Sequence, residues 1–199
     1  MAKVVQFPLA APNRLGNTVI RKKRKLDLED FGQLNLFDQG KIINLQEGQG
    51  YFDEALRLDE MGHAGAENMY RAAIDNNECV EDALCNLSVL LAAKGDRIGA
   101  IDCLTKCLEK SPRHFEAHYN LGNVYSEISN MQLAKAHYEI AIQIAPSYPN
   151  AHYNLGLVLI SLKEYKRAIE FINRYIDLSP DQHINTAKEL VNTLNAIAQ

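Results

Sequence analysis

The chain has 199 residues, with 21 Lys and Arg, 25 Asp and Glu and a formal net charge of −4, and 47% of its residues are hydrophobic. This is ordinary globular usage, and no apolar run reaches the ~18 residues that span a bilayer. The mild acidity also excludes a chain that binds nucleic acid over its whole surface. Residues 1–40 hold 7 basic and 4 acidic residues, whereas residues 41–199 hold 14 and 21. We therefore expect a tail of net charge +3 joined to a body of net charge −7.

The first segment, residues 1–46, is predicted to be a flexible basic tail and linker. Residues 1–20 contain two prolines and show no sustained hydrophobic period, so we expect them to be mobile. Five consecutive cations follow: Arg21, Lys22, Lys23, Arg24 and Lys25. Such a run can contact phosphates, attract an acidic surface, act as a nuclear address in a eukaryote, dock onto the chain's own acidic body, or stay solvated. The N-terminus lacks a basic-then-apolar export signal, so we expect a cytoplasmic protein.

A short peptide later in this tail, at residues 33–37, resembles a known binding motif. The residues Gln33, Leu34, Asn35, Leu36 and Phe37 resemble the Gln-Leu-x-Leu-Phe peptide by which bacterial replication and repair proteins bind the sliding clamp. In that resemblance Leu36 and Phe37 fill an apolar pocket, while Gln33 supplies polar contacts. Two alternatives stay open, because the same apolar residues can fold back as an N-terminal cap or form a plain linker.

The body is organised by an internal repeat. Three segments of equal length follow one another and align without gaps, namely 81–114, 115–148 and 149–182, and the phrase Ala-His-Tyr-Asn-Leu-Gly stands at both 117–122 and 151–156. A repeat of this length is typical of a unit that buries its apolar face only by stacking on the next copy. The recurring residues are Ala83, Ala117 and Ala151; Asn86, Asn120 and Asn154; Leu87, Leu121 and Leu155; Ala100, Ala134 and Ala168; and Pro112, Pro146 and Pro180.

Each unit is predicted to be a pair of helices joined by a turn. In the unit 81–114, Gly95 and Asp96 mark the turn. The closing proline ends the second helix because proline cannot continue one. In the last unit, two apolar sets at helical spacing flank a break at 163–164: Ala151, Leu155, Val158 and Leu162, then Ala168, Ile169, Ile172 and Ile176.

These units resemble the tetratricopeptide repeat (TPR) family. The family's unit has the same length, with Leu-Gly near the start, a central Ala, an aromatic residue soon after it, a second Ala and a closing Pro. The unit 115–148 fits nearly throughout, with Leu121, Gly122, Tyr125, Ala134, Tyr138, Ala141 and Pro146. The resemblance implies an all-α solenoid of helix-turn-helix repeats, a TPR superhelix whose concave wall is formed mainly by the first helix of each unit.

Both ends of the expected solenoid depart from the regular unit. Residues 47–80 are predicted to be a degenerate unit, because Ala66, Tyr70 and Ala73 precede equivalent positions of the next unit by one full repeat. Residues 183–199 carry an apolar stripe at helical spacing and are predicted to be a C-terminal capping helix. Atypical ends suit a solenoid because their outer faces meet solvent.

The leading candidate site is a row of asparagines, Asn86, Asn120 and Asn154, at one position of three successive units. A side-chain amide both donates and accepts, so it can pair with the N–H and C=O of a peptide. In some superhelical members of the resembled family, asparagines at this position hold an extended peptide in the groove. The alternative is that each asparagine satisfies backbone groups between adjacent helices.

Specificity is expected from neighbouring groove positions, for which we predict Tyr119, Asn123, Tyr153 and Leu157. The two tyrosines offer flat, partly apolar walls, although each can equally pack between repeats. Chaperone-binding members of the family hold a C-terminal carboxylate with lysines and asparagines. Here Cys85 and the two tyrosines occupy the position of the groove lysine, so a carboxylate clamp is not expected.

No catalytic or metal-binding pattern stands out in the sequence. His114 and His118 are one helical turn apart, but the acid between them is not placed as in the His-Glu-x-x-His zinc motif, so packed or capping histidines are favoured. The four cysteines lack C-x-x-C spacing and are expected to be reduced thiols that pack as small hydrophobes: Cys79, Cys85, Cys103 and Cys107. We therefore expect no enzyme, no metal and no cofactor.

Three functional hypotheses follow from these patterns. The first is a non-enzymatic scaffold or adaptor that binds a peptide or helix of another protein in the concave groove. The alternative is a nucleic-acid- or replication-associated factor recruited by the basic run and the clamp-like peptide, with the repeats binding a second protein. A third is a regulatory subunit for an enzyme encoded elsewhere. The fold alone does not decide among them.

Overall fold

The structure is a computed structural model and describes residues 16–20, 50–179 and 184–197. The basic run at 21–25 and the clamp-like peptide at 33–37 lie outside these residues. The described part contains nine helices and no strand, which confirms the all-α fold. In chain order the helices are α1 (Tyr51–Glu60), α2 (Ala66–Asp75), α3 (Val80–Ala93), α4 (Arg97–Lys110), α5 (Phe115–Glu127), α6 (Met131–Ile144), α7 (Pro149–Ser161), α8 (Tyr165–Leu178) and α9 (Ile184–Ile197).

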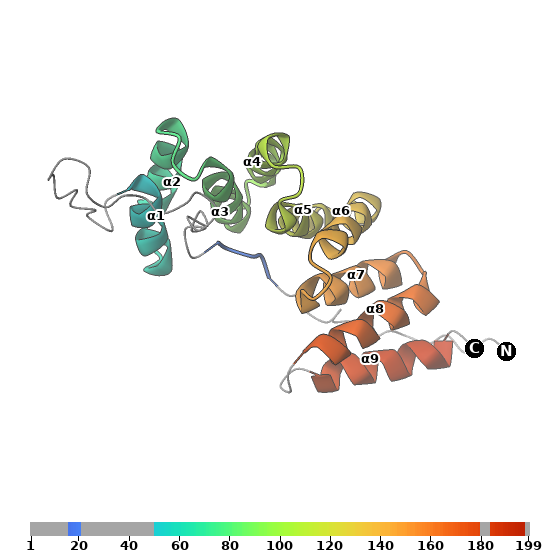
Figure 1. Ribbon diagram of the computed structural model, residues 1–199. Helices are drawn as coiled ribbons and strands as arrows, with labels where there is room; N and C mark the ends of the chain where they lie inside the picture. Colours follow the sequence, from blue (N-terminus) through green and yellow to red (C-terminus); the bar gives the residue numbers. More distant parts are fainter. Residues whose placement is uncertain (1–15, 21–49, 180–183, 198–199) are drawn as a thin grey trace, which may run out of the picture.

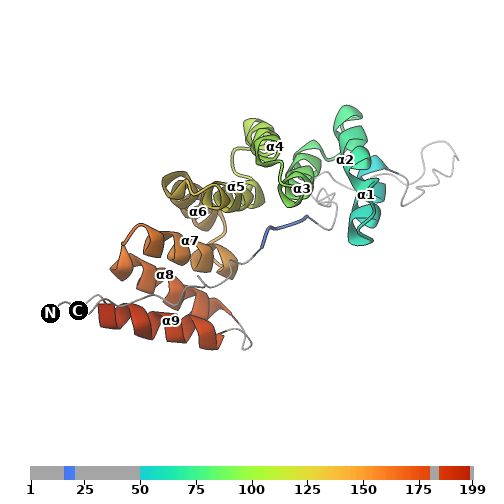
Figure 2. The ribbon, with the colours of Figure 1, turned by 180° about the vertical axis from the view of Figure 1, so that it is seen from behind.

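The helices form a stack of antiparallel pairs. The most extensive contacts join α1 to α2, α3 to α4, α5 to α6 and α7 to α8, and each pair packs on the next. The final helix, α9, packs on α8. Figure 1 shows the pairs following one another in an arc from α1 to α9, and Figure 2 shows the same order from behind. The first helices α3, α5 and α7 also contact one another, so they form one continuous wall, and the predicted solenoid is confirmed.

The turn inside each regular pair has the same backbone conformation. Gly95, Ser129 and Lys163 all have left-handed φ values, of 85°, 62° and 62°, and they occupy the same position in three successive units. Two of the following helices begin at a side-chain cap, where the Asp96 carboxylate accepts from Gly99 N at 2.9 Å and the Asn130 amide oxygen accepts from Leu133 N at 3.3 Å. The turn is therefore set by its place in the repeat, and only one copy uses the glycine that favours this conformation.

The recurrent glycine of the first helix marks the closest approach within a pair. A Cβ added to Gly122 would lie 2.6 Å from the Tyr138 ring, and one added to Gly156 would lie 2.5 Å from Cγ1 of Ile172. Both partners are fully buried and stand on the second helix of the same pair. The Leu-Gly signature thus has a packing cause, because only a residue without a side chain lets α5 reach α6 and α7 reach α8. None of the helices in 50–179 and 184–197 combines the length and apolarity needed to cross a bilayer.

Candidate peptide-binding groove

The wall formed by the first helices is occupied by a segment of the chain itself. Residues 16–20, drawn in blue in Figures 1 and 2, run in an extended conformation past α3 and α5. The sequence predicts that residues 1–20 are mobile, and in the structure hydrogen bonds from distant helices contact these five. Residues 16–20 form the docked segment.

Two asparagines of the row bind the backbone of the docked segment. Ile20 N donates to Oδ1 of Asn86 at 2.7 Å, and Nδ2 of Asn86 donates back to Ile20 O at 2.8 Å. One unit further along, Thr18 N donates to Oδ1 of Asn120 at 2.9 Å, and Nδ2 of Asn120 donates to Thr18 O at 2.8 Å. Each side-chain amide thus pairs with the N–H and C=O of one residue, and the pairing advances from Ile20 to Thr18 as the wall advances by one unit.

The second amide hydrogen of each asparagine reaches into the preceding unit. Nδ2 of Asn86 donates to the Tyr70 hydroxyl at 3.2 Å, and Nδ2 of Asn120 contacts Sγ of Cys85 at 3.5 Å. The sequence left two alternatives, holding a peptide and satisfying backbone groups between adjacent helices. In the structure the partners in the preceding unit are side chains, and the backbone groups that the two amides bind belong to the docked segment.

Tyr119 and Asn123 extend the contacts toward the start of the docked segment. The Tyr119 hydroxyl donates to Gly16 O at 2.8 Å, and Nδ2 of Asn123 donates to Oδ1 of Asn17 at 2.7 Å. Burial raises the pKa of Tyr119 far above its ordinary value, so the hydroxyl stays protonated and able to donate. Oδ1 of Asn123 accepts from the Tyr138 hydroxyl at 2.6 Å, which fixes the amide so that its Nδ2 faces the groove.

The third asparagine of the row is placed differently. Nδ2 of Asn154 donates to the Tyr119 hydroxyl and to Oδ1 of Asn123, both at 3.0 Å. Both of its hydrogens therefore orient groove residues. Tyr153 packs against the ring of Tyr175 with centroids 4.8 Å apart, and Leu157 packs against the core of the C-terminal units. A role for Tyr153 and Leu157 in binding a partner stays a prediction.

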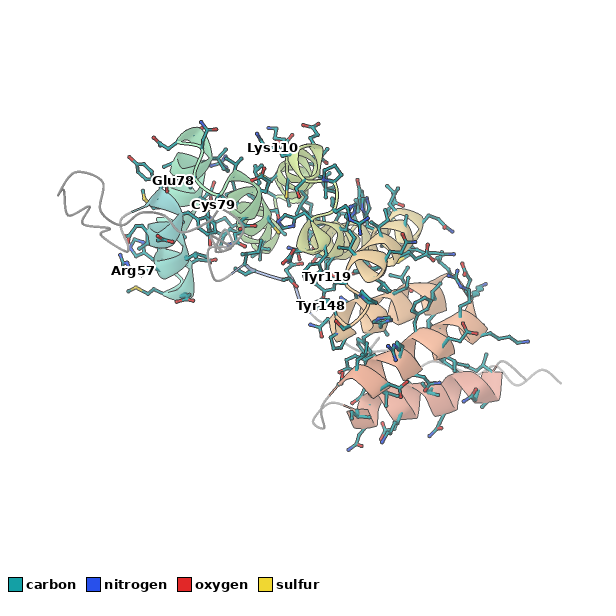
Figure 3. The ribbon with its side chains drawn as sticks, in the orientation of Figure 1. Arg57, Glu78, Cys79, Lys110, Tyr119 and Tyr148 are labelled. Atoms are coloured by element: carbon teal, nitrogen blue, oxygen red, sulfur yellow. The ribbon has the colours of Figure 1, made fainter. Side chains whose placement is uncertain are left out.

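One groove residue was missed in the sequence. The Tyr148 hydroxyl lies 2.5 Å from Oγ1 of Thr18, and the Tyr148 ring meets Phe115 and Tyr119 edge-on at 5.3 and 5.2 Å. Figure 3 shows Tyr119 and Tyr148 close together beside α5 and the start of α7. The position carries His114 one unit earlier, so no recurrence drew attention to Tyr148.

The other end of the docked segment lies against the first helix. Val19 lines a small hollow together with Leu56, Asp59 and Glu60 of α1, and the side chain of Ile20 is 8% exposed within the core of the N-terminal units. The docked segment therefore bridges the N-terminal pair and the central units.

The free energy of docking is a small difference between a gain and a cost of similar size. Each hydrogen bond between an asparagine and the docked backbone contributes a net ~0.5–1.5 kcal/mol. Ordering the backbone of each residue costs about 1–2 kcal/mol. Since gain and cost are of the same order, the burial of Ile20 adds a contribution that favours the docked state.

His114, His118 and the cysteines make contacts that stabilise the fold. His114 caps α5, where its Nδ1 accepts from Ala117 N at 3.3 Å, and His118 donates from Nε2 to Pro112 O at 3.1 Å. None of the four cysteines is joined in a disulfide, and burial raises the pKa of the Cys85 and Cys103 thiols. Within the described ranges, no group of three or more His, Cys, Asp or Glu is placed to hold a metal ion.

The repeat architecture of this chain is shared with known proteins. The family model for the tetratricopeptide repeat matches residues 85–149 and again residues 119–183. Among solved structures, MamA from Desulfovibrio magneticus RS-1 is 24% identical, with a TM-score of 0.63, and the match covers 74% of this chain and 87% of that one. The first TPR of Spaghetti (RPAP3), bound to an HSP90 peptide, is 21% identical with a TM-score of 0.56 and coverage of 60% and 94%. At these identities the likeness shows the fold.

One curated relative is an enzyme, and this chain matches only a small part of its length. The UDP-N-acetylglucosamine–peptide N-acetylglucosaminyltransferase of Giardia intestinalis is 31% identical over 106 residues. That match covers 53% of this chain but 7% of the enzyme, and it concerns the repeats alone. The two family-model matches together with the stacked helix pairs establish that residues 85–183 are tetratricopeptide repeats, units that mediate protein–protein interaction.

Proposed function

We propose that the protein is a non-enzymatic scaffold or adaptor whose concave groove holds an extended peptide of a partner protein by its backbone. The observation that carries this proposal is the paired bonding of Asn86 and Asn120 to Ile20 and Thr18. A side-chain amide that bonds both N–H and C=O of one residue recognises any non-proline residue in an extended chain.

The grip on the backbone is tolerant of sequence, so selectivity has to come from the flanking contacts. Asn123 bonds a polar side chain, Asn17, and Tyr119 bonds a carbonyl, Gly16 O. Ile20 is almost fully buried. We infer a partner peptide with an amide side chain and an aliphatic one at the spacing of Asn17 and Ile20, and without proline where the asparagines bind.

A carboxylate clamp suits this groove poorly. First-helix positions 85, 119 and 153 carry Cys, Tyr and Tyr, and the first two are fully buried. Neither a thiol with a raised pKa nor a protonated tyrosine supplies the positive charge that a C-terminal carboxylate requires. The bound HSP90 peptide belongs to the RPAP3 domain, and internal peptide backbone is the better ligand for this chain.

Recruitment to nucleic acid or to a sliding clamp depends on residues 21–25 and 33–37, which lie outside the described residues. Among residues 16–20, 50–179 and 184–197, no contact in the groove favours that alternative over peptide binding. Location in the cytoplasm and the absence of enzymatic activity stay predictions as well.

Affinity capture with Asn86→Ala combined with Asn120→Ala tests the proposed function. We expect partners recovered by the full chain to be lost, because the change removes the hydrogen bonds from both amides to the peptide backbone. Asn185→Ala, which alters an exposed asparagine on α9, is the matched control and should leave recovery unchanged. Circular dichroism must show that both variants are folded. Equal recovery by a folded double variant would refute the asparagine row as the binding site.

A further inference from the structure

We propose that the docked segment is an intramolecular ligand of the groove, so that a partner peptide binds only by displacing it. This inference rests on the proposed function, since it concerns the same groove. It adds that the groove is regulated within the chain and that the resident segment resembles the external ligand chemically.

The contacts of the docked segment are those of a bound peptide. Thr18 and Ile20 use both of their backbone polar groups on the asparagine row. Val19 lies between them, and its N–H makes no hydrogen bond to the described residues. This alternation is that of an extended strand, in which successive N–H groups point to opposite sides. The two asparagines come from different repeat units. Their spacing, which is set by how the units stack, therefore matches the spacing of alternate residues in the extended segment.

The docked segment occupies the hydrogen-bond donors of Asn86 and Asn120 that face the groove. The two hydrogens on Nδ2 of Asn86 go to Ile20 O and the Tyr70 hydroxyl, and those on Nδ2 of Asn120 go to Thr18 O and Sγ of Cys85. A second peptide therefore finds no free N–H on either amide. Bonding to an external backbone requires the segment to leave, and binding of the two is mutually exclusive.

The segment belongs to the same chain as the groove, which sets the strength of the competition. Residues 21–49 join it covalently to α1, so its binding is intramolecular and has an effective concentration on the order of mM. If the segment as a free peptide binds the groove with a Kd of about 0.1 mM, this concentration weakens every external peptide about tenfold. Tight ligands displace the segment, while weak and unspecific ones are excluded.

A peptide-binding assay on the full chain tests the proposal. The probe is a fluorescein-labelled synthetic peptide with the sequence of residues 14–22, and its Kd is measured by anisotropy for the wild type and for Thr18→Pro combined with Ile20→Pro. Proline lacks the N–H that each asparagine accepts, so the variant should open the groove. We expect the probe to bind the variant about tenfold more tightly. Val19→Pro is the matched control, because it removes an N–H that makes no such bond, and its Kd should stay within about twofold of wild type.

The outcomes separate this proposal from the proposed function. Equal affinity for wild type and for the double-proline variant would overturn the intramolecular ligand while leaving peptide binding intact. No binding to either protein would overturn both. Equal opening by Val19→Pro would refute the register.

Amide exchange followed by NMR tests whether the segment docks within its own chain. The Thr18 and Ile20 amides should be protected, lose protection when unlabelled probe is added, and give the same protection at all protein concentrations. Protection that increases with protein concentration would assign the occupant to a second copy and overturn the proposal.

Discussion

Two consecutive units, 115–148 and 149–182, carry the identical phrase Ala-His-Tyr-Asn-Leu-Gly but use it for different purposes. In the first, Asn120 bonds the backbone of Thr18, and in the second, Asn154 bonds Tyr119 and Asn123. The same side chain at the same helical position thus acts once on a peptide and once on the residues that hold the peptide. A repeated residue keeps its place in the fold, while its neighbours decide its role.

The histidines of the phrase differ in the same way. Both donate from Nε2 to the carbonyl of the preceding repeat's proline, at 3.1 Å for His118 and 2.9 Å for His152. Nδ1 of His118 then meets Nδ1 of His137 at 3.1 Å, whereas the His152 ring lies against Phe171. Nδ1 of His152 is buried without a hydrogen-bond partner among the described residues. The facing residue on the second helix, a histidine in one unit and a phenylalanine in the other, accounts for the difference.

The largest expected effect on the free energy of unfolding comes from replacing Asn154 and Asn120 by alanine, each in a separate variant. Asn154→Ala should lower the free energy of unfolding by about 1–3 kcal/mol, because it removes two buried bonds that orient groove residues. Asn120→Ala should lower it less, since the freed Thr18 backbone can turn to water. Urea denaturation of both variants measures the contrast. Equal destabilisation would mean that the two asparagines have the same role.

The two close-approach glycines should also differ. Overpacking a core costs about 1–3 kcal/mol, and replacing glycine by alanine in a helix recovers up to about 1 kcal/mol. For Gly122→Ala we expect a net loss of about 1–2 kcal/mol, because the facing ring of Tyr138 is held by its bond to Asn123. Gly156→Ala should cost less, because the added Cβ would approach one atom, Cγ1 of Ile172, closer than 3.0 Å, whereas the one at position 122 would approach three atoms of a rigid ring that closely. Thermal unfolding of both variants checks the order, and a costlier Gly156→Ala would contradict it.

A smaller effect is expected at Tyr148, which stands where the preceding unit has the capping His114. Tyr148→Phe keeps the ring contacts with Phe115 and Tyr119 but removes the bond to Thr18, worth ~0.5–1.5 kcal/mol. Protection of the Thr18 amide should fall by up to about tenfold, while the unfolding midpoint stays within error. A shifted midpoint with unchanged protection would show that Tyr148 serves the core and not the groove.

The smallest expected effect is a pH dependence that distinguishes the two histidine positions. Burial lowers the pKa of His137 to about 4, and the neighbouring His118 also lowers it. The unfolded chain, with a histidine pKa of about 6.5, therefore binds more protons than the folded one between about pH 6.5 and 4. Stability is full above this window and is lost as the pH falls through it. His137→Phe, which copies the arrangement at Phe171, should reduce that loss.

Urea midpoints at about pH 7 and pH 5 provide the measurement, since these values bracket the ordinary histidine pKa. Burial lowers the pKa of His118 and His152 as well, so the variant keeps part of the acid sensitivity. For each protein, the change in urea midpoint between about pH 7 and pH 5 is determined. The change in His137→Phe is then subtracted from the change in the wild type. A difference of zero would show that the His118–His137 pair does not contribute.

The repeat register predicted the helix pairs and the asparagine row because both follow from a local period. Asn86 and Asn120 could be singled out since three copies of one residue stand at one position. The docked segment could not, because a short extended stretch carries no period and its partners lie 66 and 102 residues away. Tyr148 was missed for a related reason, since its neighbours in space come from the tail and from α5. Recurrence reveals what the units share, and contacts between unlike segments leave no such trace.

The docked segment advances by two residues for each repeat unit, so the number of units sets the length of peptide that the groove can bind. Ile20 meets Asn86 and Thr18 meets Asn120, so the docked chain runs against the order of the repeats. The length of peptide that the wall can read is then set by how many successive units present a free amide. In Asn154 the corresponding Nδ2 is already engaged by Tyr119 and Asn123, which ends the N–H donation from the row after Asn120. A unit added before α3 with asparagine at the same position would lengthen the recognised stretch by one more such step, toward its C-terminal end.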